Sequence, residues 1–317
     1  MDLLTALIVA GLFGGGAAAA PAIPAAAPAA DPAAAPPTLA AELSWLPERP
    51  VQGHLVRLVV TPSAGESLTD IAGEVGGEPV HFEPAAGGRW TALAPVPVDT
   101  EGTLSLRLQA TDGRGTTTEL SAEMPVEAGD YRHERLSVAP RLGSSLNAAD
   151  QAHLDRDRAK AAEVARQAHA SPRLWTSERV IPREDRVTSG FGNGRVFNGQ
   201  VSSRHLGLDL DGDPGDVIVA PTRGVVALVD TFLLAGNIVY LNHGGGLVSG
   251  YFHLSEALVA EGDTVTAGTP IGRVGATGRV TGPHLHWVVR IGSTSLDPRS
   301  LLDLPLDATF DRVPGGR

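Results

Sequence analysis

The chain reads PHLHWVVR at residues 283–290, and this stretch decides the interpretation of its C-terminal third. The apolar run that follows the histidines is typical of a β-strand. Because side chains alternate along a strand, we expect His284 and His286 on one face and Leu285 buried on the other. Two charged histidines this close would repel each other, so placing both on one buried face is costly without a function. A histidine pair at the surface is the simple alternative.

The residues around this stretch predict a compact β domain. Short apolar runs at residues 224–229 and 237–241 are typical of further strands. The region is rich in glycine and valine and has little helix signal. We therefore place a C-terminal β domain at residues 179–306.

A second histidine motif reads HLGLD and begins at His205. In a strand, His205 and Asp209 would share one face, while Leu206 and Leu208 would point into the core. Gly207 would leave room between the imidazole and the carboxylate. A neutral imidazole and a carboxylate are good zinc ligands. The same spacing also occurs often by chance, so this motif is weak evidence when taken alone.

Other histidines stand alone in the sequence. His253 lies in the segment YFHLS, residues 251–255, and a lone histidine in an apolar run is more often structural. His243 precedes a run of glycines, and we expect it to be structural as well. His54 and His81 are isolated, and we expect surface or hydrogen-bonded histidines there.

The composition restricts the metal chemistry that is open to these residues. The chain has no cysteine, so any metal must be held by His, Asp or Glu. A catalytic zinc takes three protein ligands and keeps one position open, and two histidines with one aspartate would give a net charge of about +1. Such a zinc remains a strong Lewis acid. No His-Glu-x-x-His motif is present, so a histidine would have to act as the base.

The region of residues 180–300 resembles the lysostaphin/LytM-type zinc metallopeptidase family. The similarity runs in order through SGFG (189–192), FNG (197–199), HLGLD (205–209), PGDVIVA (214–220), GNIV (236–239), YFHLS (251–255), GDTV (262–265) and GRVTGPHLHW (278–287). This number of ordered segments at such spacing argues against chance similarity.

The resemblance assigns roles to individual residues. It implies that His205, Asp209 and His286 bind Zn²⁺, and that His253 and His284 form the catalytic pair. It also implies a compact antiparallel β-sheet domain with a groove over the zinc. Family members hydrolyse peptide bonds in peptidoglycan stems or bridges. We therefore expect a zinc endopeptidase acting on peptidoglycan peptides, with stem-peptide cross-links as the favoured substrate.

The chain departs from the family pattern in one respect. Some members place a tyrosine shortly before the first zinc histidine, where it helps to stabilise the oxyanion. This chain has Phe197 in that region and no tyrosine, so this contribution is not expected. Arg204 directly precedes His205, and we expect it to form a surface salt bridge rather than to contact substrate carboxylates.

Other functions account less well for the sequence. A non-catalytic LytM-type binding module that activates another cell-wall hydrolase would usually lack one of the five site residues, and all five are present. A biotinyl or lipoyl carrier is suggested by residues 261–272, but its turn needs a lysine. The only lysine is Lys160, which lies in a predicted helix. The net charge of −11 argues against binding to nucleic acid.

The front part of the chain predicts a second β domain. Residues 39–130 carry several short strand patterns separated by turns rich in glycine and proline, which indicates an Ig-like β-sandwich. Strands are expected at residues 54–61, 90–98 and 103–110. The last of these alternates apolar and polar residues, as a half-buried strand does.

A helix is expected at residues 147–169, as a linker between the two domains within residues 131–178. Asn147 can cap it. Its apolar stripe is mostly alanine, so we expect thin packing. Asp155 and Asp157 point to different helix faces, and we expect both in solvent rather than in a metal site.

The ends of the chain predict export. Residues 1–20 contain an apolar run, Leu3 to Phe13, followed by small residues, which is typical of a signal peptide although no Lys or Arg precedes the run. The run is shorter than the about 20 residues that span a bilayer. Residues 21–38 form an Ala/Pro-rich disordered linker, and residues 307–317 form a tail. We expect an exported protein, periplasmic or secreted, without a transmembrane span in its mature chain.

Overall fold

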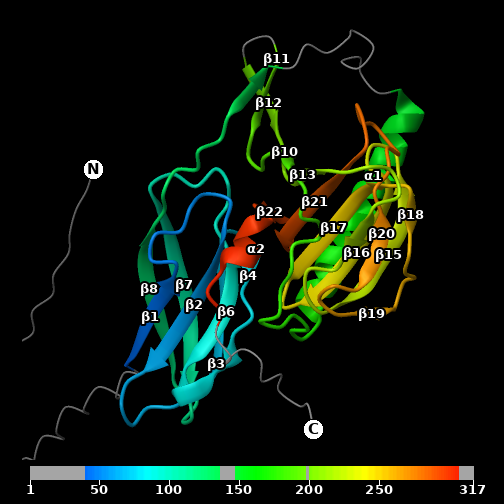
Figure 1. Cartoon of the computed structure of the whole chain (residues 1–317). Coiled ribbons are helices and arrows are strands. Elements are labelled where there is room, and N and C mark those ends of the chain that lie inside the picture. Colours follow the sequence, from blue (N-terminus) through cyan, green and yellow to red (C-terminus); the bar gives the residue numbers. More distant parts are fainter. Residues whose placement is uncertain (1–39, 136–146, 198–199, 307–317) are drawn as a thin grey trace, which may run out of the picture. The chain divides into compact units, whose positions relative to one another are not determined.

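The computed structural model describes residues 40–135, 147–197 and 200–306. These residues form mostly antiparallel sheets and one long helix, as Figure 1 shows, so the predicted mainly β fold is confirmed. The predicted signal peptide (1–20), Ala/Pro-rich linker (21–38) and tail (307–317) lie outside the described residues. The predicted domain boundaries stay predictions.

The strands before residue 126 form two four-stranded sheets, in the orders β1-β2-β6-β5 and β4-β3-β7-β8. Their bounds are β1 (Ala41–Leu46), β2 (Leu55–Pro62), β3 (Leu68–Val75), β4 (Glu78–Pro79), β5 (Glu83–Pro84), β6 (Trp90–Pro95), β7 (Thr103–Asp112) and β8 (Thr117–Pro125), with a short 3₁₀ turn at Ala86–Gly88. One buried cluster joins the two sheets and includes Val56, Leu58 and Leu106. The two sheets thus share a core, as a sandwich does, while the Ig-like comparison stays a prediction.

An eight-stranded sheet dominates the C-terminal part, in the order β10-β13-β21-β17-β16-β15-β19 with β22 paired to β21. Its strands are β10 (Val187–Ser189), β13 (Leu208–Asp211), β15 (Gly224–Phe232), β16 (Gly236–Gly244), β17 (Leu247–Leu254), β19 (Thr264–Val265), β21 (His284–Ile291) and β22 (Thr294–Leu296). Two three-stranded sheets accompany it, formed by β9 (His133–Arg135), β11 (Gly194–Phe197) and β12 (Gln200–Arg204), and by β14 (Val217–Val219), β18 (Glu256–Ala257) and β20 (Pro270–Arg273).

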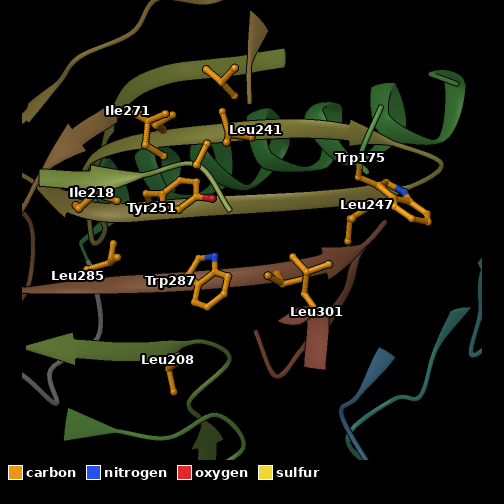
Figure 2. Close-up of a cluster of buried hydrophobic side chains, with 14 of the residues drawn as sticks. Trp175, Leu208, Ile218, Leu241, Leu247, Tyr251, Ile271, Leu285, Trp287 and Leu301 are labelled. Atoms are coloured by element: carbon orange, nitrogen blue, oxygen red, sulfur yellow. The ribbon is translucent and has the colours of Figure 1, made fainter. Parts of the chain in front are cut away.

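Strand β21 lies between β13 and β17 and anchors the core of this sheet. Leu285 and Trp287 are fully buried on it, and they belong to one cluster with Leu208 of β13 and Tyr251 of β17 (Figure 2). Because side chains alternate along a strand, the residues between them face the other side. This packing confirms the predicted burial of Leu285.

Helix α1 (Ala148–Ala170) covers one face of this sheet. The side chain of Asn147 accepts a hydrogen bond from the backbone N–H of Asp150 (2.9 Å), which confirms the predicted cap. Val164 and Ala168 are its buried apolar contacts with a cluster from β15, β16, β17 and β21. Few large side chains of this helix are buried, as its alanine-rich stripe predicts. The second helix, α2 (Arg299–Asp303), is a single turn. Among the described residues, no helix is long and apolar enough to cross a bilayer.

The prediction for Asp157 is wrong. Asp155 is exposed as expected, but Asp157 is 5% exposed and accepts a hydrogen bond from the backbone N–H of Leu233 (2.8 Å). Leu233 follows β15, in the connection to β16. The helix face that carries Asp157 therefore meets this connection rather than solvent, and the carboxylate satisfies a backbone donor there.

Candidate active site

Three neighbouring strands bring the predicted site residues together. In the antiparallel pair of β13 and β21, Asp209 lies opposite His286 and Asp211 lies opposite His284. On the other side of β21, Phe252 of β17 lies opposite His286. The sheet register thus places one carboxylate and two histidines on adjacent strands.

His205 joins this group from a loop, which corrects the predicted strand. Strand β13 begins only at Leu208, so His205 and Leu206 precede it. Leu206 is 41% exposed instead of pointing into the core, whereas Leu208 is buried as predicted. The imidazole of His205 is 3% exposed. The chain turn, rather than strand alternation, directs it toward Asp209.

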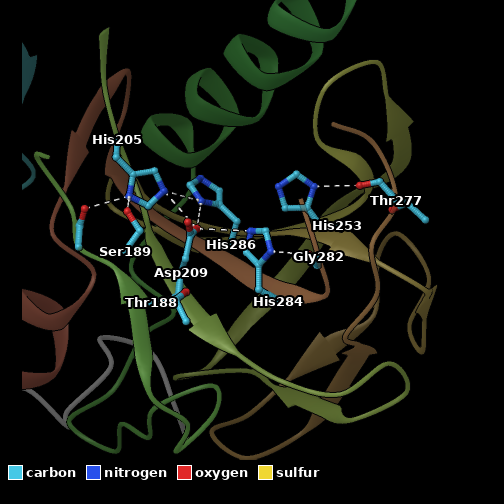
Figure 3. Close-up of polar contacts among 10 residues, drawn as sticks. Thr188, Ser189, His205, Asp209, His253, Thr277, Gly282, His284 and His286 are labelled. Carbon is cyan, nitrogen blue, oxygen red and sulfur yellow. Dashed lines mark hydrogen bonds and ion pairs between the residues drawn. The ribbon is translucent and has the colours of Figure 1, made fainter. Parts of the chain in front are cut away.

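The three predicted zinc ligands converge on one point (Figure 3). The carboxylate atom Asp209 Oδ1 lies 3.1 Å from His205 Nε2 and 2.6 Å from His286 Nδ1. The two imidazole nitrogens lie 3.1 Å apart. These three atoms are the one cluster among the described residues that could hold a metal ion, all within 4.8 Å of one another.

The orientation of the His205 ring is set by the chain at residues 189–192. His205 Nδ1 donates to the carbonyl oxygen of Gly190 at 2.9 Å and lies 3.3 Å from Ser189 Oγ. A carbonyl oxygen can only accept, so the neutral ring has its hydrogen on Nδ1 and its lone pair on Nε2. That lone pair faces Asp209 and His286. Such a hydrogen bond fixes the tautomer that a metal ligand needs.

Gly207 leaves the room that the sequence predicts, although for a different neighbour. A Cβ atom at this position would lie 2.5 Å from His286 Cε1 and 2.8 Å from the carbonyl oxygen of Trp287. Any larger residue would therefore displace the His286 ring or the β21 backbone. The missing side chain of Gly207 makes room for the His286 ring, and it does not separate His205 from Asp209.

His253 and His284 lie beside this cluster, with ring centroids 5.0 Å apart. His253 Nδ1 donates to the carbonyl oxygen of Thr277 (3.0 Å), and His284 Nδ1 donates to that of Gly282 (2.9 Å). In its neutral form, each ring therefore carries its hydrogen on Nδ1 and a lone pair on Nε2. His284 Nε2 lies 3.7 Å from Asp209 Oδ1. The five residues named from the sequence thus form one constellation (Figure 3).

Residues 203–298, which include all five of these residues, match Peptidase family M23. The chain carries a peptidase family M23 domain. It is 38% identical over 122 residues to the peptidoglycan DD-endopeptidase ShyC of Vibrio cholerae, a match that covers 38% of this chain and 28% of ShyC. It is 39% identical over 97 residues to the DD-carboxypeptidase/endopeptidase Mpg of Neisseria meningitidis, covering 31% of this chain and 22% of Mpg. The chain thus spans less than a third of the length of these curated relatives.

A solved structure extends the similarity beyond the M23 domain. A crystal structure described as a peptidase M23 from Pseudomonas aeruginosa superimposes with a TM-score of 0.60 at 26% sequence identity. The superposition covers 80% of this chain and 95% of the other. The M23 peptidase fold is therefore matched.

The electrostatics of the M23 domain site favour metal binding. Burial by itself raises the pKa of Asp209, but the close contacts with the His205 and His286 imidazoles outweigh burial and hold this pKa well below its usual range. Burial lowers the pKa of His286 against the opposing effect of Asp209. Burial also lowers the pKa of His253 to about 4, although the hydrogen bond to Thr277 opposes it. At neutral pH the carboxylate is ionised and both of these imidazoles are neutral, which are the states that a metal site requires.

Several contacts of the M23 domain site carry little signal in the sequence. The carbonyl groups of Gly190, Thr277 and Gly282 orient three histidines, but every residue has a carbonyl group. The ring of Phe252 stacks on His286 with centroids 5.4 Å apart and planes 28° apart. These residues could have been identified only from their position inside or beside the sequence segments that resemble the family.

The remaining predictions for single residues are confirmed. Arg204 forms an ion pair with Asp99 (3.0 Å), as a surface salt bridge would. His243 is fully buried and structural. His81 hydrogen-bonds His169 (2.8 Å), and His54 is partly buried near Asp297. The side chain of Phe197 lies outside the described residues.

Proposed function

We propose that this protein is a zinc-dependent endopeptidase that hydrolyses peptide bonds in peptidoglycan. The observation that carries the proposal is the convergence of three ligand atoms beside two histidines whose Nδ1 atoms are held by backbone carbonyls. Three protein ligands, which leave the fourth coordination position of a zinc ion open, are the arrangement of a catalytic rather than a structural zinc site.

The donor set fits zinc. It consists of His205 Nε2, His286 Nδ1 and Asp209 Oδ1, that is, two imidazoles and one carboxylate within ligating distance of one point. The hydrogen bond from His205 Nδ1 to the carbonyl of Gly190 supplies the outer support that metal-binding histidines commonly have. When bound, zinc would supply Lewis acidity, lowering the pKa of a water molecule and polarising the scissile carbonyl.

Two histidines of the chain would carry out the proton transfers. The Nδ1 hydrogens of His253 and His284 are held by backbone carbonyls, so each neutral ring has its lone pair on Nε2. One imidazole accepts the proton of the attacking water at Nε2 and passes it to the leaving amine. The other donates a hydrogen bond to the developing oxyanion when it is protonated. Catalysis by a histidine pair also accounts for the missing glutamate base.

The substrate is inferred from the relatives. ShyC and ShyA of Vibrio cholerae are named peptidoglycan DD-endopeptidases, and they match this chain at 38% and 39% identity around the site. We infer that the favoured substrate is the cross-link between stem peptides. Such a substrate lies outside the cytoplasm, which agrees with an exported protein, periplasmic or secreted.

The proposal can be tested with purified protein and cross-linked muropeptide dimers, analysed by mass spectrometry. Conversion of dimers to monomers that stops with a chelator and resumes with added zinc is expected, and the product masses identify the cleaved bond. The His284→Ala variant is the matched control, because it leaves the three ligand positions unchanged. Intact dimers after incubation with zinc-loaded protein would contradict the proposal and favour a non-catalytic module that activates another cell-wall hydrolase.

A further inference from the structure

Thr277 makes four hydrogen bonds, and all of them tie it to the chain around His253. Its carbonyl oxygen accepts from His253 Nδ1 (3.0 Å), and its own N–H donates to the carbonyl of His253 (3.4 Å). Its hydroxyl accepts from the backbone N–H of Asn237 (2.9 Å) and donates to the carbonyl of Leu254 (2.9 Å). One residue thus connects the loop before β21 to the start of β16 and the end of β17.

The turn before β16 is closely fitted to Thr277. Gly236 has φ +65°, and a Cβ atom there would lie 2.3 Å from Thr277 Oγ1 and 2.4 Å from Thr277 C. Gly278 has φ +76°, and a Cβ atom there would lie 2.4 Å from the backbone nitrogen of Gly236. The backbones therefore approach each other where side chains would not fit.

His253 itself has an unusual backbone. With φ +65°, it is the one non-glycine residue with positive φ among the described parts of the chain. Such a conformation persists only where the surroundings impose it. The N–H of His253 donates to the carbonyl of Ala235 (2.9 Å), and its carbonyl accepts from the N–H of Thr277. The turn and Thr277 thus hold this backbone from both sides.

We propose that Thr277 is a positioning residue that sets the tautomer and the direction of the His253 ring. Its carbonyl can only accept, so it selects the ring form with hydrogen on Nδ1 and the lone pair on Nε2. Its hydroxyl holds this carbonyl in place by bridging Asn237 and Leu254. The consequence for cleavage rests on the proposed function, whereas the consequence for the tautomer does not.

The tautomer is measured by NMR of ¹⁵N-histidine-labelled, zinc-loaded protein near neutral pH, with the His253 signals assigned from their absence in His253→Gln. The wild type is expected to show a protonated Nδ1 and an unprotonated Nε2. Thr277→Val keeps the shape but removes the hydroxyl, and a mixture of both ring forms is expected. Thr277→Ser restores the hydroxyl and should restore the single form. Thr281→Val, in the same loop, is the matched control, because its exposed side chain has no hydrogen bond in the described structure.

The wild-type spectrum decides the proposal even where Thr277→Val does not fold. Hydrogen on His253 Nε2 in the wild type would overturn it, as would a single Nδ1-protonated form in folded Thr277→Val. Neither result depends on activity. Absence of cleavage by the wild type would remove the proposed function and leave this measurement valid.

With a soluble muropeptide dimer as substrate, kcat of Thr277→Val is expected to fall by about 10- to 100-fold, the usual effect of removing an outer-shell partner. KM should stay within about twofold, because substrate binding is not altered. Thr277→Ser should recover most of kcat. Equal losses in the serine and valine variants would show that the hydroxyl does not position the ring.

Discussion

Asp209 and His286 lie directly opposite each other on β13 and β21, and Asp209 Oδ1 is 2.6 Å from His286 Nδ1. This contact joins the two strands of the site through the groups that would bind the metal. Asp209 is also 3.1 Å from His205 Nε2, so its carboxylate is the common partner of both imidazoles.

Replacement of Asp209 by alanine should therefore abolish both metal binding and cleavage. The variant loses the anionic ligand that lies between the two imidazoles. Metal analysis of purified protein is expected to show about one zinc per chain in the wild type and almost none in the variant. Normal zinc content in Asp209→Ala would remove this carboxylate from the ligand set.

Replacement of His284 by alanine should separate metal binding from catalysis. The His284 ring is held by Gly282 and is not one of the three clustered ligands. Zinc content should stay near that of the wild type, while kcat on muropeptide dimers should fall by about 10²- to 10⁴-fold, as for loss of a general acid–base. Circular dichroism checks that the fold is unchanged. Full activity of this variant would exclude a catalytic role for His284.

Alternation along strands made much of this sheet predictable from the sequence. Leu285 and His286 of β21 lie on the faces that the pattern indicates, because a slip by one residue would bury the histidines and expose Leu285. Leu206 was predicted wrongly by the same rule. The strand starts two residues later, and sequence patterns locate the ends of elements poorly.

Two contacts between distant segments could not be predicted from the sequence. Asp157 is buried where helix α1 meets the connection after β15, and its carboxylate accepts a hydrogen bond from the backbone N–H of Leu233. Thr277 contacts His253 through a backbone carbonyl, a group that every residue has. Only the path of the chain through space brings such partners together.

Gly207→Ala should weaken zinc binding without removing a ligand. The new methyl group would lie 2.5 Å from His286 Cε1, so the ring must shift away from Asp209 and His205. We expect zinc affinity to fall by about 10- to 100-fold, as when the support of a ligand is lost. A competition titration with a chromogenic chelator measures the change. Affinity equal to that of the wild type would mean that the β21 backbone can adapt to the added group.

His243 forms a buried polar chain that is separate from the site. Its Nδ1 donates to the carbonyl of Arg223 (2.8 Å), so its Nε2 accepts from Ser249 Oγ (2.7 Å). Ser249 Oγ in turn accepts from the hydroxyl of Tyr251 (2.8 Å). A proton on His243 Nε2 would turn this acceptor into a donor and reverse the chain. The neutral imidazole is therefore the form that fits the core.

This arrangement predicts a loss of stability in mild acid. Burial lowers the pKa of His243 to about 4, against the opposing hydrogen bond to Arg223. An unfolded chain would protonate the same group at about pH 6.5. The unfolded state thus binds more protons between these values, and the free energy of unfolding falls as pH drops from 6.5 through 4. Protonation of His243 in the unfolded chain should lower the free energy of unfolding by about 3 kcal/mol over this pH range. Urea unfolding at several pH values should show a shallower acid decline for His243→Asn than for the wild type, and equal slopes would contradict a neutral, buried His243.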